Sequence, residues 1–335
     1  MPRQARIDAP GALHHIICRG IERRPIFKDN NDRADFVRRL SVLLPQTATR
    51  CYAWALIPNH FHLLLKTGEI PISTVMRRLL TGYAISFNLR HRRHGHLFQN
   101  RYKSILCQED TYLLELIRYI HLNPLRAKQV SSFEELANHP WCGHGCLLGK
   151  TDVAWQLTTE VLARFGRKLS AAQKNYAAFV ADGVKQGKRH DLVGGGLIRS
   201  SGGWKQLQEQ SRAGFKQKSD ERILGDGEFV ETVLAQAEEQ LESQTHYHQM
   251  GITFETLAER ISTLFEIEKD ELLSAGKQPA RVRARSLLCF WAVRKLGMTT
   301  AAVAHKVGMT QPAVSRAVER GRGLAGEVEI DPIGA

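Results

Sequence analysis

One stretch decides the fold: Ile57-Pro58-Asn59-His60-Phe61-His62-Leu63-Leu64-Leu65. Successive side chains of a β-strand point to opposite faces, so His60 and His62 share one face while Phe61 and Leu63 share the other. The apolar face can enter a core while the two imidazoles converge on one point outside it. A second apolar run at 51–57 precedes Pro58-Asn59, which predicts a hairpin of two strands.

The sequence around this stretch predicts a mixed α and β domain over residues 1–148. We expect strands at 13–18, 51–57, 60–66 and 104–107, and helices at 31–44, 72–89 and 110–123. Apolar residues at helical spacing support the first helix, and Pro124 is expected to stop the third. The order β-α-β-β-α-β-α predicts an α+β, ferredoxin-like fold, with an antiparallel sheet and helices on one face.

Composition narrows the class of protein. The 335 residues carry 47 Lys and Arg against 34 Asp and Glu, a net charge of +13. This balance favours nucleic acid or an anionic membrane surface as partner. Membrane is the weaker choice, because no apolar run approaches the ~20 residues of a spanning helix and no secretory signal opens the chain. The six cysteines are scattered, which predicts reduced thiols in a bacterial cytoplasm.

The rest of the chain divides into a connector and a helical domain. Residues 149–250 predict short helices at 171–182 and 227–241, with glycine-rich loops at 194–196 and 200–203. Residues 251–324 predict five helices, at 254–265, 269–274, 281–296, 300–307 and 311–320. Gly297 and Gly308 fall where helices are expected to end.

A metal-assisted nicking site is one interpretation of the two histidines. Neutral imidazoles bind first-row metals, and carboxylate or amide oxygens complete sites for Mg²⁺ or Mn²⁺. A cation on a scissile phosphate offsets the charge of the transition state. Tyr119 and Asn123 are four residues apart in Tyr119-Ile120-His121-Leu122-Asn123-Pro124, and hence lie on one face of a helix. Asn123 can then offer its amide oxygen to the metal while Tyr119 faces the phosphate.

Plainer interpretations stay open at this point. His60 and His62 can be ordinary half-buried strand residues, and Tyr119 a core tyrosine. A structural zinc site is less favoured, because zinc usually takes four nitrogen or sulfur ligands. The segment 142–146, Cys-Gly-His-Gly-Cys, is interpreted as a loop. His14, His15 and His121 are expected to be structural, although a ligand role is open for each.

Three segments together resemble a known family. They are P-N-H-F-H-L-L-L at 58–65, H-L-F-Q-N-R-Y-K-S at 96–104 and Y-I-H-L-N-P-L-R-A at 119–127. Their order and spacing resemble the HUH single-tyrosine transposases, and most closely the REP-associated tyrosine transposase branch. The resemblance implies His60 and His62 as metal ligands, Asn123 as third ligand and Tyr119 as nucleophile. It also implies a 5′-phosphotyrosine intermediate on single-stranded DNA, with palindromic hairpins as substrates.

Basic residues beside this site predict contacts to DNA. Side chains of this kind would hold backbone phosphates with a strong salt dependence. Phe98 and Tyr102 are candidates for stacking on unpaired bases, and Tyr102 also for packing. The basic residues are Arg90, Arg92, Arg93, Arg101 and Lys103. A solvated charged face is the plainer alternative.

The C-terminal residues predict a second DNA-binding module. Residues 300–307, a turn at Gly308, Thr310 as N-cap and a helix from 311 form a helix-turn-helix pattern. Residues 251–321 resemble the C-terminal domain of the replication initiator DnaA, although A-V-S-R departs from that family's recognition helix. A helical oligomerisation bundle is the alternative. The residues expected to contact duplex DNA are Arg281, Arg283, Arg285, Gln311, Ser315 and Arg316.

The combined hypothesis is a cytoplasmic, nucleoid-associated bacterial DNA transposase, monomeric or homodimeric. It would use Mg²⁺ or Mn²⁺ and bind single-stranded hairpin DNA and duplex DNA. One rival is a transcription or replication regulator with an inactive nicking domain. Another is a relaxase or replication initiator, which shares the histidine pair but acts on a transfer origin.

Overall fold

The chain divides into two compact units, Met1–Val233 and Leu234–Ala335. The computed structural model describes residue 7 and residues 11–68, 70–187, 189, 192, 220, 222–235, 247, 250–274, 276 and 278–327. The first unit therefore extends well beyond the predicted boundary at 148. These two units do not test the predicted functional division of the chain into three parts.

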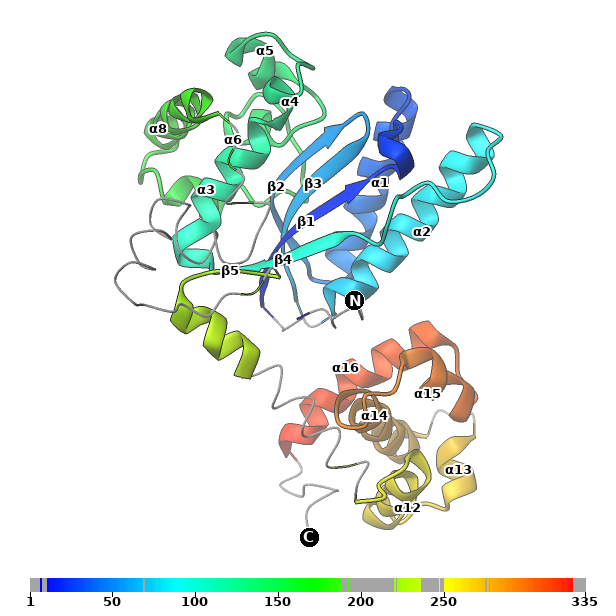
Figure 1. Ribbon diagram of the computed structural model, residues 1–335. Coiled ribbons are helices and arrows are strands. Elements are labelled where there is room, and N and C mark those ends of the chain that lie inside the picture. Colours follow the sequence, from blue (N-terminus) through cyan, green and yellow to red (C-terminus); the bar gives the residue numbers. More distant parts are fainter. Residues whose placement is uncertain are drawn as a thin grey trace, which may run out of the picture. The chain divides into compact units, whose positions relative to one another are not determined.

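A five-stranded sheet forms the centre of the first unit (Figure 1). Its strands are β1 (Leu13–Arg19), β2 (Arg50–Ile57), β3 (His60–Lys66), β4 (Lys103–Cys107) and β5 (Ile223–Leu224), in the order β2-β3-β1-β4-β5. The first four strands confirm the prediction and pair antiparallel. The short β5 pairs parallel with β4 and was not predicted, since two residues leave no periodic pattern.

The predicted hairpin joins β2 to β3. Ile57 pairs with His60 across the turn at Pro58-Asn59. The carbonyl of Pro58 accepts the amides of Ile26 and Phe27, at 2.7 and 3.0 Å, which ties the turn to the segment after β1. The register also places Ile17 of β1 opposite His62. The histidines of β3 therefore lie on a strand that is paired on both sides.

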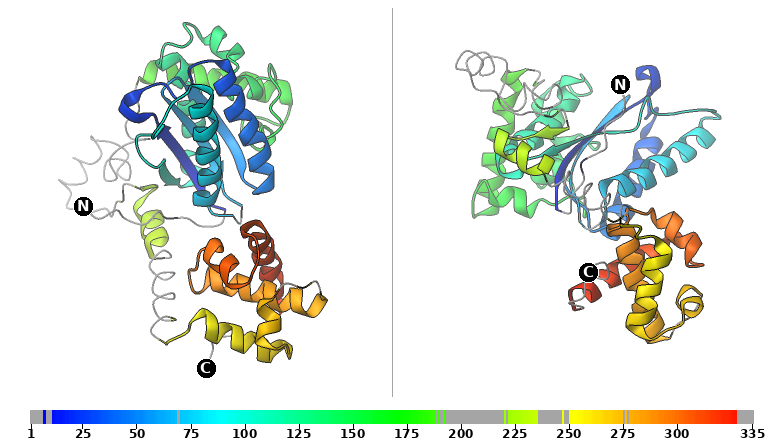
Figure 2. Two further views of the ribbon diagram at one scale, coloured as in Figure 1. Left: turned by 90° about the vertical axis from the view of Figure 1, so that its right-hand side faces the viewer. Right: turned by 60° about the horizontal axis from the view of Figure 1, so that its bottom comes forward.

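Helices cover both faces of the sheet, which corrects the prediction of one face. Helices α1 (Asn30–Gln46) and α2 (Ile72–Arg90) lie side by side on one face, as Figure 2 shows. They pack on a cluster that contains Ile16 and Leu63. Helix α3 (Glu109–His121) packs on the other face, on a cluster that contains Leu13 and Leu64. Strands β1 to β3 carry apolar side chains on both faces of the sheet, so helices must cover both faces.

Shorter helices extend the layer beside α3. They are α4 (Asn123–Arg126), α5 (Phe133–Asn138), α6 (His144–Leu147), α7 (Thr159–Ala163) and α8 (Leu169–Asp182), with 3₁₀ turns η1 (Ile21–Arg23) and η2 (Gly183–Gln186). Helix α8 confirms the prediction at 171–182, and residues 227–235 are helical. The glycine-rich loops at 194–203 and the end of the helix predicted to 241 lie outside the described residues.

The second unit is helical in its described part. Its helices are α12 (Phe254–Phe265), α13 (Lys269–Leu273), α14 (Pro279–Arg294), α15 (Thr300–Lys306) and α16 (Gln311–Glu327). The five predicted helices are confirmed, with ends shifted by a few residues. Leu288, Trp291 and Val314 share its core. Gly297 and Gly308 end α14 and α15 with φ of 66° and 61°, values that favour glycine.

The fold is thus mixed α+β in the first unit and helical in the described part of the second, while the ferredoxin-like assignment stays a prediction. Within the described ranges, no helix combines the length and apolar composition that crossing a bilayer requires.

Candidate functional site

A pocket in the first unit brings together the predicted nucleophile, the three predicted metal ligands and two of the predicted DNA-binding residues. Its volume is about 360 Å³. Residues of β1, β3, β4, α3 and α4 contribute, together with the loop before β4. The lining residues are Ile17, Cys18, Arg19, His60, His62, Gln99, Asn100, Arg101, Lys103, Tyr119 and Asn123.

The two histidines of β3 share one face, as predicted from strand alternation. Their ring centres are 5.1 Å apart at an interplanar angle of 76°. Phe61, Leu63 and Leu65 point the other way into the core beneath α1 and α2. The apolar residues thus anchor the strand, and the imidazoles are left to line the pocket.

Asn59 determines which ring nitrogen of His60 carries the hydrogen. The side-chain nitrogen of Asn59 donates to the carbonyl oxygen of Arg23 at 3.2 Å, so its Oδ1 is the atom facing His60. Nδ1 of His60 lies 2.6 Å from that oxygen. A carbonyl oxygen only accepts, so Nδ1 carries the hydrogen and donates it. In a neutral ring, Nε2 of His60 then keeps its lone pair.

His62 has a different partner, the fully buried His15 of β1. Nδ1 of His62 lies 3.0 Å from Nε2 of His15, and the ring centres are 5.3 Å apart in a stacked arrangement. The sequence analysis expected a structural role for His15 and left a ligand role open. Strand alternation puts His15 on the same face as Ile17, but only the sheet register shows that Ile17 pairs with His62.

Burial keeps both pocket imidazoles neutral. It lowers the pKa of His60 from 6.5 to about 4, with a smaller contribution from the positive charge of Arg19. Burial also holds the pKa of His62 well below 6.5, aided by His15, His60 and Arg19. Neutral imidazole is the form that binds a metal ion, because protonation removes the lone pair.

Tyr119 lies on α3 against the histidines. Its ring centre is 5.7 Å from that of His62 and 6.0 Å from that of His15, both nearly edge-on. The ring is partly buried, packs on the core beneath α3 and lines the pocket. The phenol ring therefore lies beside the rings of His62 and His15.

Asn123 lies one turn beyond Tyr119 and lines the same pocket. Its side-chain nitrogen donates to the carbonyl oxygen of Tyr119 at 3.1 Å, which leaves its amide oxygen available. The prediction of one helix stopped by Pro124 is wrong in detail. Helix α3 ends at His121, and Pro124 sits in the first turn of α4, where a missing amide costs little.

The residues of the pocket fit a divalent cation. The two neutral imidazoles and the amide oxygen of Asn123 are nitrogen and oxygen donors suited to Mn²⁺, or to Mg²⁺ with added oxygen ligands. His60, His62 and Asn123 are the residues that could hold it.

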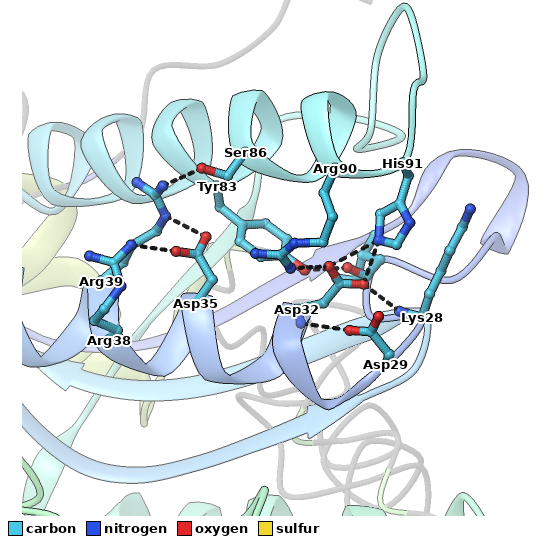
Figure 3. A network of polar contacts seen from close by, with 11 residues as sticks. Lys28, Asp29, Asp32, Asp35, Arg38, Arg39, Tyr83, Ser86, Arg90 and His91 are labelled. Atoms are coloured by element: carbon cyan, nitrogen blue, oxygen red, sulfur yellow. Dashed lines mark hydrogen bonds and ion pairs between the residues drawn. The ribbon is translucent and has the colours of Figure 1, made fainter.

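A second cluster of metal-binding residue types, Asp29, Asp32 and His91, lies elsewhere in the unit (Figure 3). The carboxylate of Asp32 is fully buried and already bonded to Arg90 at 2.6 Å and to His91 at 2.9 Å. It also accepts the amide of Lys28 at 2.9 Å. Because Arg90 already pairs with the Asp32 carboxylate, we interpret the cluster as a link between α1 and the end of α2, and not as a metal centre.

The predicted basic residues divide into two groups. Arg101 and Lys103 line the pocket beside Tyr119, and Arg19, Gln99 and Asn100, which the sequence analysis missed, line it with them. Arg90 is held by Asp32 and so has a structural role.

The other members of that basic and aromatic set lie away from the pocket lining. Arg92 is exposed, and Arg93 lies over the ring of Phe87 at 5.7 Å. Tyr102 is 6% exposed in the core beneath α1 and α2, and Phe98 is partly buried there. The expectation that Tyr102 stacks on a base is wrong for this structure because its ring is packed, as the alternative expectation had it.

The six residues predicted to contact duplex DNA also differ in exposure and in their contacts. Arg283 and Arg316 are exposed. Arg285 is 5% exposed and donates to the carbonyls of Ser274 and Gly276, both at 2.8 Å, so it supports the fold instead of facing DNA. Arg281 pairs with Glu271, Gln311 donates to Thr300 at 3.0 Å and Ser315 donates to the carbonyl of Gln311. Gln311, Ser315 and Arg316 follow one another along the first turns of α16.

His121 is structural, in agreement with the sequence analysis, and His144 shares its surroundings. The hydroxyl of Tyr176 lies 2.7 Å from Nδ1 of both His121 and His144, in the core beneath α3. All three side chains are fully buried. Cys142 and Cys146 flank them as buried free thiols.

Arg126 is a further residue at the site that the sequence analysis missed. Its guanidinium lies 5.3 Å from the centre of the Tyr119 ring and donates to the Tyr119 carbonyl at 3.4 Å. A second nitrogen donates to the carbonyl of Gly183 in η2, also at 3.4 Å. Residues beyond the predicted boundary at 148 thus brace the helix that carries the tyrosine.

Comparison with known proteins agrees with this geometry. Residues 10–123 match the family model described as "Transposase IS200 like". This part of the chain is similar to the IS200-like transposases. The match covers about a third of the chain, includes His60, His62, Tyr119 and Asn123, and supports a transposase role.

Among solved structures, the chain aligns with a REP-associated tyrosine transposase bound to a REP hairpin, at 15% identity and a TM-score of 0.37. The alignment covers 47% of this chain and 98% of that chain. A likeness of this size carries no inference about fold or substrate. A search among curated proteins gave no match.

Proposed function

We propose that the protein is a metal-dependent DNA transposase that nicks and rejoins single-stranded DNA at hairpin-forming repeats. The observation that carries the proposal is the meeting of Tyr119 with His60, His62 and Asn123 in one pocket. The family match over residues 10–123 supports the same class of reaction.

Tyr119 is the proposed nucleophile. Its phenol oxygen would attack the phosphorus of a DNA phosphodiester while the bond from phosphorus to the 3′ oxygen breaks. The phenol proton is lost and the leaving oxygen gains one, so the products are a 5′-phosphotyrosine and a free 3′-hydroxyl. The reverse reaction with another 3′-hydroxyl rejoins the strand, because the phosphotyrosine keeps the energy of the phosphodiester bond.

The other pocket residues have supporting roles. A Mg²⁺ or Mn²⁺ ion held by His60, His62 and Asn123 would offset the negative charge that develops on the phosphate. Arg101 and Lys103 would neutralise the phosphates on either side and so position the strand. Positioning matters because binding and aligning the nucleophile can lower the activation barrier by about 7–11 kcal/mol. Arg19 adds a third positive charge at the same wall.

The second unit is proposed as a helix-turn-helix module for duplex DNA. Helices α15 and α16, joined by the turn at Gly308, support this proposal. Arg316 and Arg283 are exposed and suited to phosphate or base contacts. We keep the functional division into a nicking domain, a connector and a duplex-binding domain as part of the proposal. Hairpin shape and the helix-turn-helix would then share the choice of target.

A cleavage assay tests the proposal. Full-length protein is incubated with single-stranded hairpin DNA and Mn²⁺ and examined on a denaturing gel. The enzyme should cleave the strand and retain its 5′ end on the protein, and both products should be absent in Tyr119→Phe. Tyr112→Phe is the matched control, because Tyr112 lies on the same helix and is absent from the pocket lining.

The same assay separates the rivals. A regulator with an inactive nicking domain binds the hairpin without cleaving it. A relaxase prefers a transfer-origin strand to transposon-end hairpins. Either result would overturn the proposed reaction.

A further inference from the structure

Both pocket imidazoles use the same ring nitrogen for a hydrogen bond inside the protein. His60 uses Nδ1 toward Asn59, at 2.6 Å, and His62 uses Nδ1 toward His15, at 3.0 Å. Both rings line the pocket, so Nε2 is the nitrogen with which each ring can bind a ligand there. The two histidines are therefore supported in the same way by different partners.

The hydrogen positions follow directly for His60 but not for His62. The oxygen of Asn59 can only accept, so it fixes the hydrogen of His60 on Nδ1. Between His62 and His15, either nitrogen can be the donor. If His15 donates, the single hydrogen of a neutral His62 sits on Nε2 and blocks the nitrogen that faces the pocket. If His62 donates, Nε2 keeps its lone pair.

We propose that His15 is a positioning residue of the metal site, whose Nε2 accepts from Nδ1 of His62 and fixes the lone pair of His62 Nε2 toward the pocket. This inference rests on the proposed function, since it assigns a role at the same site. A ligand histidine commonly donates its other ring N–H to a fixed acceptor, which sets its tautomer and orientation. His15 performs here the task that Asn59 performs for His60.

The position of His15 suits this role. Its side chain is fully buried, and its own strand β1 pairs with β3 throughout. Its ring stacks on His62 and lies edge-on to Tyr119, so it restrains both side chains at once. His15 is absent from the pocket lining and so does not compete for the ligand itself.

His14 provides a matched control within the same strand. It is equally buried, but strand alternation turns it to the opposite face of the sheet. There its Nδ1 lies 3.1 Å from the hydroxyl of Ser104. Replacing His14 removes a buried imidazole from β1 without touching His62.

The first test needs no substitution in β1. Nuclear magnetic resonance of metal-free, full-length protein labelled with ¹⁵N-histidine reports which ring nitrogen carries the hydrogen, and His62→Gln assigns the signal. We expect the hydrogen of His62 on Nδ1. A hydrogen on Nε2 of His62 would overturn the inference.

The second test measures Mn²⁺ affinity by electron paramagnetic resonance. His15→Leu, which removes the acceptor, should weaken Mn²⁺ binding about 10–100-fold. His15→Gln, whose amide oxygen can accept, should recover most of the loss, and His14→Leu should bind as the wild type does. Unchanged binding in His15→Leu, or equal losses in His15→Leu and His14→Leu, would overturn the inference.

Failure of the proposed function gives a different pattern. If the wild type binds Mn²⁺ in a manner that depends on His15 but leaves hairpin DNA uncut, the reaction is wrong and the positioning role stands. If the wild type cuts DNA and His15→Leu binds Mn²⁺ normally, the reaction stands and the positioning role is wrong.

Discussion

The guanidinium of Arg126 lies 5.3 Å from the centre of the Tyr119 ring and donates to the Tyr119 carbonyl oxygen. The same side chain reaches the carbonyl of Gly183 in η2. Arg126 thus links the proposed nucleophile to a segment about sixty residues further along the chain. This contact gives the residues after 148 a direct part in holding the site.

Replacement of Arg126 should slow cleavage without preventing DNA binding. In Arg126→Gln the ring of Tyr119 loses its cation–π contact, and its backbone loses a donor. We expect a single-turnover cleavage rate about 10–100-fold lower, because small displacements of a nucleophile have large effects. Hairpin affinity, measured by fluorescence anisotropy, should stay near the wild-type value. Arg164→Gln, at an exposed position, is the control; equal rates in the two variants would contradict this role.

Asp32 should be important for stability. Its buried carboxylate is bonded to Arg90, His91 and the amide of Lys28. Asp32→Asn leaves Arg90 without its counter-charge; because Arg90 is partly exposed and water screens it, the loss should be about 1–3 kcal/mol. Urea unfolding measures this loss. Glu22→Gln breaks an exposed pair with Arg24 and should cost less than about 1 kcal/mol; similar losses would show that burial of Asp32 has no effect.

Acid should destabilise the first unit through its buried histidines. Burial lowers the pKa of His14 and of His144 from 6.5 to about 4. Between these values the unfolded chain binds a proton at each site and the folded chain does not. The free energy of unfolding therefore falls as pH falls, by up to about 1.4 kcal/mol per pH unit for each group.

Urea unfolding across this pH range checks the expectation. His144→Gln keeps an acceptor or donor for Tyr176 but removes one titrating group, so the dependence on pH should become shallower. His94→Gln, at an exposed position, should leave the dependence unchanged. A wild-type protein that is equally stable at both ends of the range would disprove the expectation.

The second unit offers a contrast between two arginines. Arg316 is exposed on α16, whereas Arg285 is bonded to the carbonyls of Ser274 and Gly276. Arg316→Ala should weaken duplex binding and reduce the slope of log affinity against log salt by about 1 if the residue contacts a phosphate. Arg285→Ala should mainly lower the melting temperature of this unit. Anisotropy titrations in a salt series distinguish the two effects; an unchanged slope in Arg316→Ala would argue against a phosphate contact.

Local sequence patterns predicted much of the site because its parts follow backbone periodicity. His60 and His62 share a strand face through alternation, and Tyr119 and Asn123, four residues apart, line the same pocket although they belong to α3 and α4. The pattern could not give pairings between distant strands, so it missed the contact of His15 with His62. It also treated Arg285 as a surface residue and left Tyr102 open between base stacking and packing, because charge and aromaticity alone do not reveal burial. The second helical layer was missed although β1 to β3 carry apolar residues on both faces, because the ferredoxin-like assignment places the helices on one face.

The proposed mechanism identifies Tyr119 as the residue that becomes covalently bonded to DNA, and mass spectrometry can identify that residue. After reaction with hairpin DNA and Mn²⁺, nuclease and trypsin treatment should leave a phosphorylated or nucleotidylated peptide. Cleavage after Arg118 and Arg126 releases residues 119–126, in which Tyr119 is the only tyrosine. We predict that mass spectrometry finds the added phosphate on this peptide in the wild type and on no peptide in Tyr119→Phe. Modification at another tyrosine, or a covalent link that persists in Tyr119→Phe, would contradict the account.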